Sequence, residues 1–202
     1  MASPPQPPPP VVGIPGLGVS GTLPPFVGSG TPTTASMSPF AATLLQTAQL
    51  FCGSRVRVAI FRGLLEYRRT LASLGFSEGF QWLSGSFTED IERLEGRDPK
   101  DVDLVTFCTP PAHCQTPADI QALVVGNPEV FIPLRAKARF HCDPYFVNLL
   151  LHPVNTVSQT RYWFGLFSHR RGGLWKGLLQ VPLAVSQDDV DSETFLSGLS
   201  NP

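Results

Sequence analysis

The sequence predicts a mixed α/β protein of the α+β kind, in which helices flank one small mixed β-sheet. Two observations predict this class. Apolar residues recur at helical spacing over residues 56–74, and short β-prone runs alternate with helical segments farther along the chain. The 202 residues suit a single domain with tails, because one hydrophobic core usually serves roughly 100–200 residues.

Composition divides the chain into three parts. Residues 1–36 carry a proline run and then a Gly/Ser/Thr-rich stretch, so we expect a flexible N-terminal arm whose apolar stretch at residues 23–26 is able to dock. Residues 37–185 hold the apolar periodicity and form the predicted domain. Residues 186–202 are acidic and predict a C-terminal tail that frays.

Capping residues place the helices. Ser38 followed by Pro39 predicts a helix over 39–51, because serine caps helices and proline suits the first helical position. Ser54 caps a second, longer helix that Gly75 ends in a left-handed conformation. Shorter helices are expected over residues 117–125, 133–139 and 161–167.

β-prone runs lie between these helices. One surrounds Phe80 and Trp82 and is closed by Gly85, after which Phe87 to Leu94 suit one or two helical turns. Further strands are expected over residues 102–107, 145–151 and 175–183. Strands and helices therefore interleave around one sheet.

The overall charge of the chain does not favour binding to nucleic acid. The formal net charge is −1, so any such binding requires a local basic surface. The long second helix offers one candidate, since it carries five arginines against a single glutamate. The alternative is an ordinary solvent-exposed face.

The chain shows neither a secretory signal pattern nor a run of about 18 apolar residues, so no membrane span is expected. Its four cysteines are therefore expected to stay reduced, and the predicted location is cytoplasmic.

Gly85-Ser86 is the first candidate site. It follows a predicted strand and precedes a predicted helical turn. Glycine lets a backbone approach a phosphate closely, serine adds a hydroxyl, and the free N–H groups of a helix start favour an anion. Gly-Ser also makes ordinary turns. Lys176, beside Gly177, is a candidate to neutralise phosphate charge, or else an ordinary surface lysine.

Three aspartates form the second candidate site. Asp101 and Asp103 share one face of a strand, because side chains alternate along it, while Val102 and Leu104 face the other side. Two close carboxylates favour a divalent cation between them, although solvated acids at a strand start are the alternative. Asp143 precedes another β-prone run and could approach the pair from a neighbouring strand, or simply belong to an Asp-Pro turn.

These motifs resemble the polymerase-β-like nucleotidyltransferase superfamily. The resemblance is to a group of small, largely uncharacterised prokaryotic proteins, in which a Leu-Pro lead-in and two helices precede W-L-x-G-S-F, followed by D-x-D and a late Lys-Gly pair. This chain has, in that order, Leu23-Pro24, Trp82-Leu83-Ser84-Gly85-Ser86-Phe87, Asp101-Val102-Asp103 and Lys176-Gly177.

The resemblance covers residues 23–183 and departs from the pattern in two respects. Fourteen residues separate Ser86 from Asp101, a few more than in many minimal nucleotidyltransferases, and Asp143 sits beside Pro144, not in the middle of an alternating strand. The resemblance implies a nucleotidyltransferase-like fold and transfer of a nucleoside monophosphate from an NTP. Asp101, Asp103 and Asp143 would bind Mg²⁺ or Mn²⁺, and Gly85, Ser86 and Lys176 would bind the nucleotide.

The acceptor stays open between RNA, a protein and a small molecule, and a toxin–antitoxin or defence role is an extension. The alternative is a non-catalytic nucleotide-binding or protein-interaction module with the same fold. A structural viral or phage protein that binds neither NTP nor metal is the third possibility.

Overall fold

A computed structural model describes residues 13–199, which form a five-stranded mixed sheet in the order β1-β5-β2-β3-β4. β3 runs antiparallel to β2 and parallel to β4, while β5 runs antiparallel to β2 and parallel to β1. The strands are β1 Phe40–Ala41, β2 Gly79–Ser84, β3 Val102–Cys108, β4 Cys142–Asn148 and β5 Leu179–Pro182. The predicted class, a mixed sheet with flanking helices, is confirmed.

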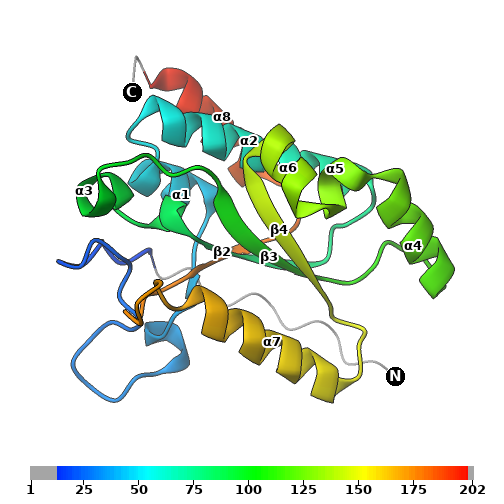
Figure 1. Cartoon of the computed structure of the whole chain (residues 1–202), viewed down its shortest axis with the longest axis horizontal. Helices are drawn as coiled ribbons and strands as arrows, with labels where there is room; N and C mark the ends of the chain where they lie inside the picture. Colours follow the sequence, from blue (N-terminus) through cyan, green and yellow to red (C-terminus); the bar gives the residue numbers. More distant parts are fainter. Residues whose placement is uncertain (1–12, 200–202) are drawn as a thin grey trace.

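Helices cover both faces of this sheet (Figure 1). α7 lies on one face, and α1, α2, α5, α6 and α8 lie on the other. Two short 3₁₀ turns, η1 Thr34–Ser36 and η2 Ser86–Thr88, complete the described elements. The helices are α1 Leu44–Phe51, α2 Arg55–Ser73, α3 Ile91–Glu95, α4 Pro117–Gly126, α5 Pro128–Phe131, α6 Pro133–Phe140, α7 Pro153–Phe167 and α8 Gln187–Gly198.

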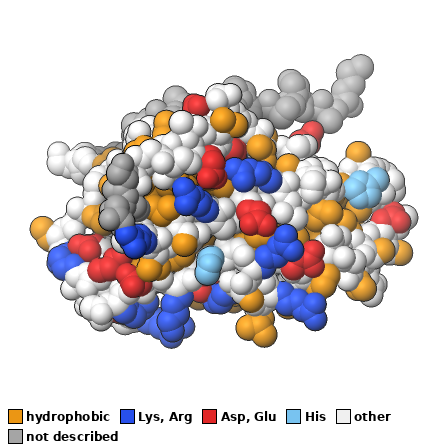
Figure 2. All heavy atoms as spheres, turned by 90° about the horizontal axis from the view of Figure 1, so that it is seen from above, with side chains coloured by type: hydrophobic (Ala, Val, Ile, Leu, Met, Phe, Trp, Pro, Cys, Tyr) orange, Lys and Arg blue, Asp and Glu red, His pale blue; other side chains and the backbone are white. Residues whose placement is uncertain are grey.

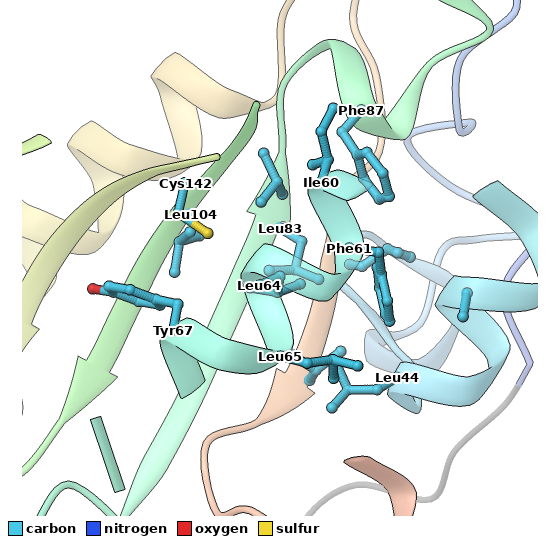
Figure 3. Packing of buried hydrophobic residues seen from close by; sticks show 14 of the residues in the cluster. Leu44, Ile60, Phe61, Leu64, Leu65, Tyr67, Leu83, Phe87, Leu104 and Cys142 are labelled. Carbon is cyan, nitrogen blue, oxygen red and sulfur yellow. The ribbon is translucent and has the colours of Figure 1, made fainter. Parts of the chain in front are cut away.

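The main core lies between α2 and the sheet. α2 forms where predicted: the Ser54 hydroxyl accepts a hydrogen bond from the backbone N–H of Arg57 at the start of the helix. Its apolar stripe then packs on Leu83 and Leu104 of the sheet, as Figure 3 shows. The buried apolar residues of α2 are Val58, Ile60, Phe61, Leu64, Leu65, Tyr67 and Leu71.

A smaller apolar cluster fills the α7 side of the sheet. Val105 and Phe107 of β3 pack there with Trp163 of α7, whereas Leu104 belongs to the α2 side. Side chains alternate along a strand, so Asp103 shares the face of Val105 and Phe107. The predicted separation of Asp103 from Val102 and Leu104 is therefore confirmed.

The first predicted helix begins later than expected. Thr43 is the cap of α1, and its hydroxyl accepts from the backbone N–H of Gln46 at 3.0 Å. Phe40 instead belongs to β1, where its N–H donates to the carbonyl of Leu178 at 2.9 Å. Pairing with β5 thus overrides the local capping signal at Ser38, and a helix start at residue 39 was wrong.

The C-terminal segment is not a frayed tail in the described residues. It forms α8, which begins after the cap Ser186, and buries Asp189 against the guanidinium of Arg68 at 2.9 Å. Both side chains are almost fully buried, so this ion pair fixes α8 to α2. Asp189 is one of the acids that suggested a solvated tail, and its ion pair with Arg68 holds α8 in place.

Part of the predicted N-terminal arm also packs on the domain. Residues 1–12, which contain the proline run, lie outside the described residues. Leu23 is fully buried, and its carbonyl accepts from the N–H of Gly177 at 2.8 Å. The predicted docking of the apolar stretch at residues 23–26 is confirmed at Leu23, because burial removes its apolar side chain from water.

Candidate functional site

A cleft of about 650 Å³ opens at the end of the sheet where β3 and β4 begin. It is bounded by the turn after β2, by the start of β3 and by the segment that follows α7. The lining includes every site residue that the sequence predicts, namely Gly85, Ser86, Asp101, Asp103, Asp143 and Lys176. Residues as far apart as 85 and 176 in the chain thus share one cavity.

The parallel pairing of β3 with β4 brings the aspartates together. Asp103 and Asp143 are direct register partners on these neighbouring strands, and Asp101 lies two positions before Asp103. Because register partners of a parallel pair lie on the same face of the sheet, the three carboxylates face the same side. Asp143 therefore does approach the pair from the neighbouring strand.

This arrangement concentrates negative charge. Burial, together with the neighbouring carboxylates of Asp101 and Asp143, raises the pKa of Asp103 from its usual value of 3.8 to about 6. The side chains of Asp101 and Asp143 are only 13% and 16% exposed. Three carboxylates this close together repel one another, which raises the free energy of the folded protein unless a cation lies among them.

The cation that the structure supplies is Lys137, which the sequence did not single out. Its ammonium lies 3.0 Å from a carboxylate oxygen of Asp101 and 3.0 Å from one of Asp143. Burial alone would lower the pKa of Lys137, but the hydrogen bonds to Asp143 and Asp101 outweigh burial and raise it. The signal in the sequence was a lysine six residues before Asp143, in a helix that runs directly into β4.

The donor set suits a hard divalent cation, since carboxylate oxygens are the ligands that Mg²⁺ and Mn²⁺ prefer. Within residues 13–199, however, no group of three or more His, Cys, Asp or Glu side chains is arranged to hold a metal ion. The ammonium of Lys137 already lies between Asp101 and Asp143. The residues fit a metal in chemistry and charge, but Lys137 has to leave for the carboxylates to close around it.

The Gly85-Ser86 turn is adapted to Asp103. Gly85 has a φ of 80°, and a Cβ at this position would collide with the Asp103 carboxylate. Ser86 opens η2, a single 3₁₀ turn of three residues, in place of a longer helix. A turn this short has little dipole, so any phosphate-binding role depends on the Ser86 hydroxyl and on the open backbone at Gly85.

Lys176 is buried and is not a surface lysine. Only 4% of the residue is exposed, and its ammonium donates to the Gly85 carbonyl at 3.1 Å and to the carboxylate of Glu89. The guanidinium of Arg170 binds the other oxygen of Glu89 at 2.9 Å. Lys176 therefore holds the Gly85 turn in place. The sequence did not reveal Glu89 as its partner, because the two residues lie 87 positions apart in the chain.

Exposed cations complete the cleft. Arg97, Lys100 and Arg171 line it and are exposed. Arg97 is paired with Glu95 at 2.8 Å. The cleft therefore has an acidic floor and a basic rim, the combination that a metal-bound polyphosphate requires.

The predicted basic surface of α2 is largely neutralised. Arg57 is paired with Glu92 and Arg68 with Asp189, while Arg62 and Arg69 share Glu193. Figure 2 shows blue and red side chains interspersed on this side of the molecule. The arginines mainly hold neighbouring elements together, which weakens the argument for RNA binding at α2.

A second cavity, of about 220 Å³, lies at the opposite end of β3 and β4. Its lining is almost entirely apolar and includes Phe76, Phe131 and Phe146, whose ring centroids lie 5.1–6.1 Å apart. Of these two cavities, the first is the one whose lining offers charged groups to a ligand.

Among the described residues, no helix has the length and apolar character needed to cross a membrane.

Comparison with known proteins gives one match. The model of a family of unknown function, DUF6932, matches residues 15–182, a range that contains the sheet and the described site residues. No curated protein and no solved structure matches the chain significantly. Because this family model matches most of the chain, the protein belongs to the DUF6932 family.

Proposed function

We propose that this chain is a metal-dependent nucleotidyltransferase, with a fold of the polymerase-β-like type, that moves a nucleoside monophosphate from an NTP to an acceptor. The observation that carries the proposal is the register of Asp103 with Asp143 on parallel strands, with Asp101 on the same face. Carboxylates from two strands are the ligand set that phosphoryl transfer with Mg²⁺ or Mn²⁺ uses. The backbone turn at Gly85 packs directly against Asp103.

Each aspartate has its own role in the proposed reaction. Asp101, Asp103 and Asp143 would hold the Mg²⁺ or Mn²⁺, which would supply positive charge to the triphosphate and to the attacking oxygen. Asp143 orients the acceptor hydroxyl and takes its proton. The acceptor oxygen then bonds to the α-phosphorus, the bond from that phosphorus to the bridging oxygen breaks, and pyrophosphate leaves with the electron pair.

The rest of the cleft binds the nucleotide. The Ser86 hydroxyl and the exposed side chains of Lys100 and Arg171 lie where they can contact the β- and γ-phosphates. Lys176 supports this contact through its hydrogen bond to the Gly85 carbonyl. The cleft volume of about 650 Å³ falls within the range of roughly 300–1,000 Å³ usual for small-molecule sites.

The proposed acceptor is RNA, a protein or a small molecule. A toxin–antitoxin or defence system is one setting for such a reaction. The neutralised arginines of α2 remove the main reason to favour RNA. The proposed compartment is the cytoplasm, where the four free cysteines stay reduced.

The test is transfer of an α-phosphate-labelled NTP in the presence of Mn²⁺, together with calorimetric titration of the NTP. We expect label on an acceptor or on the protein itself, and loss of transfer in Asp101→Asn combined with Asp103→Asn. Asp98→Asn is the matched control, because Asp98 is an exposed acid in the preceding loop. If the double variant and the native chain bind NTP and Mn²⁺ identically, the proposal is wrong.

A second function is favoured by one observation, the bridge from Lys137 to Asp101 and Asp143. A carboxylate site that already contains an ammonium has part of its negative charge compensated without a metal, as expected of a non-catalytic nucleotide-binding or protein-interaction module. Such a module binds NTP without needing Mn²⁺ and transfers no label. The same two measurements therefore separate it from the enzyme.

A further inference from the structure

We propose that Lys137 is an exchangeable cation of the site. Its ammonium compensates part of the negative charge of Asp101 and Asp143 until a divalent metal binds, and then turns into the cleft to contact a phosphate of the nucleotide. This inference rests on the proposed function, to which it adds a phosphate-binding residue and a cost for metal binding.

The first half follows from the contacts of the ammonium. It is shared between two carboxylates at equal distances of 3.0 Å, so it lies where a metal bridging those carboxylates would lie. An ammonium and a divalent cation cannot share this place, because like charges repel at such distances. Metal binding therefore requires Lys137 to leave, and the lost ion pairs reduce the metal affinity.

The second half follows from where Lys137 can go. Its side chain is 41% exposed and lines the same cleft as Ser86 and Lys100. Ala136 and Phe140 of α6 are fully buried, so the helix backbone stays fixed and only the flexible four-carbon stem has to rotate. The ammonium then meets the developing negative charge of the bound polyphosphate.

The exchange predicts changes of opposite sign in two affinities. Removing the ammonium frees two carboxylates for the metal, so metal binding strengthens. The same removal deletes a phosphate contact, so nucleotide binding weakens once metal is present. A lysine with a purely structural role would shift both affinities in the same direction, or neither.

The experiment uses the full chain and the variant Lys137→Met, which keeps a long apolar stem without the charge. Mn²⁺ binding is measured by electron paramagnetic resonance, and binding of a non-hydrolysable ATP analogue by calorimetry at saturating Mn²⁺. We expect Mn²⁺ to bind about tenfold more tightly and the analogue about tenfold more weakly than in the native chain.

Two further variants serve as controls. Arg135→Met removes a charge from an exposed position of the same helix and should change neither affinity by more than about twofold. Lys137→Arg keeps the charge and should keep the Mn²⁺ affinity near the native value. Circular dichroism of each variant verifies that it is folded.

The outcomes separate the two proposals. Equal Mn²⁺ affinity in the native chain and Lys137→Met overturns the exchange but leaves the enzyme standing. Mn²⁺ binding to neither protein overturns the enzyme. Tighter Mn²⁺ binding with unchanged nucleotide affinity overturns the phosphate contact, and matching changes at Arg135→Met overturn any specific role for Lys137.

Discussion

Gly85 lies directly against the carboxylate of Asp103, with no space between them for a side chain. A Cβ on Gly85 would collide with that carboxylate, and the φ of 80° is one that L-residues rarely adopt. The turn after β2 and the acid on β3 are therefore packed as one unit. The glycine of the Gly-Ser pair is required by this contact whatever ligand the cleft binds.

Gly85→Ala should destabilise the fold by about 3 kcal/mol, because it combines backbone strain with a steric clash. Urea denaturation followed by tryptophan fluorescence measures the change. Gly96→Ala is the control, since Gly96 also has a positive φ, of 63°, but has open space around it. Its cost should be only the strain, about 1 kcal/mol. Equal losses in the two variants would show that the contact with Asp103 is unimportant.

Stability should fall as the pH rises from about 4 to about 6, because of Asp103. Its pKa is raised from 3.8 to about 6 in the folded protein. Between these values the unfolded chain releases the proton and the folded chain retains it, so deprotonation favours unfolding. The loss is about 3 kcal/mol, at roughly 1.4 kcal/mol per pKa unit.

Asp103→Asn removes this dependence, because the amide does not ionise. We expect the variant to match the native protein below pH 4 and to be more stable than it at pH 7. Denaturation at a series of pH values gives both curves. Parallel curves across pH 4–6 would show that Asp103 is not the titrating group.

Lys176 and Glu89 should be strongly coupled. The ammonium and the carboxylate are both about 5% exposed, so removing Glu89 leaves the Lys176 ammonium in the interior without its carboxylate partner. Glu89→Gln should cost about 3–5 kcal/mol, and Lys176→Met with Glu89→Gln should cost less than the sum of the two single changes. A double-mutant cycle by chemical denaturation measures the coupling, and additive losses would contradict it.

Arg68 and Asp189 should determine whether α8 stays docked. Arg68→Met leaves a buried carboxylate without its partner and should cost about 3–5 kcal/mol in the free energy of unfolding. Arg69→Met is the control, because Arg69 forms only an exposed pair with Glu193 and should cost less than about 1 kcal/mol. Similar losses at the two positions would show that α8 is not anchored by the buried pair.

The sequence predicted most elements of the fold because local signals and tertiary packing agree there. Ser54 caps α2 and Thr116 caps α4 as expected, and β3 alternates between its two faces from Val102 onward. Predictions failed where a distant partner competes with a local preference. Phe40 pairs with β5 in place of continuing a helix, and Asp189 is buried by Arg68 in place of being solvated.

The sequence predicted six site residues from short motifs that follow one another along the chain, and the structure places all six around one cleft. Lys137 and Glu89 were missed. Each acts through a charge partner that the fold brings close, and a single lysine or glutamate does not reveal that partner from the sequence.

The sequence by itself determined which residues could carry charge chemistry and which faces of the elements they occupy, because these depend on residue type and on local periodicity. Only the tertiary structure decided that Asp143 meets Asp103, and that Lys137 lies between Asp101 and Asp143. These relationships depend on strand order and on the position of α6 beside β4. They arise from packing between segments that the chain brings together only when it folds.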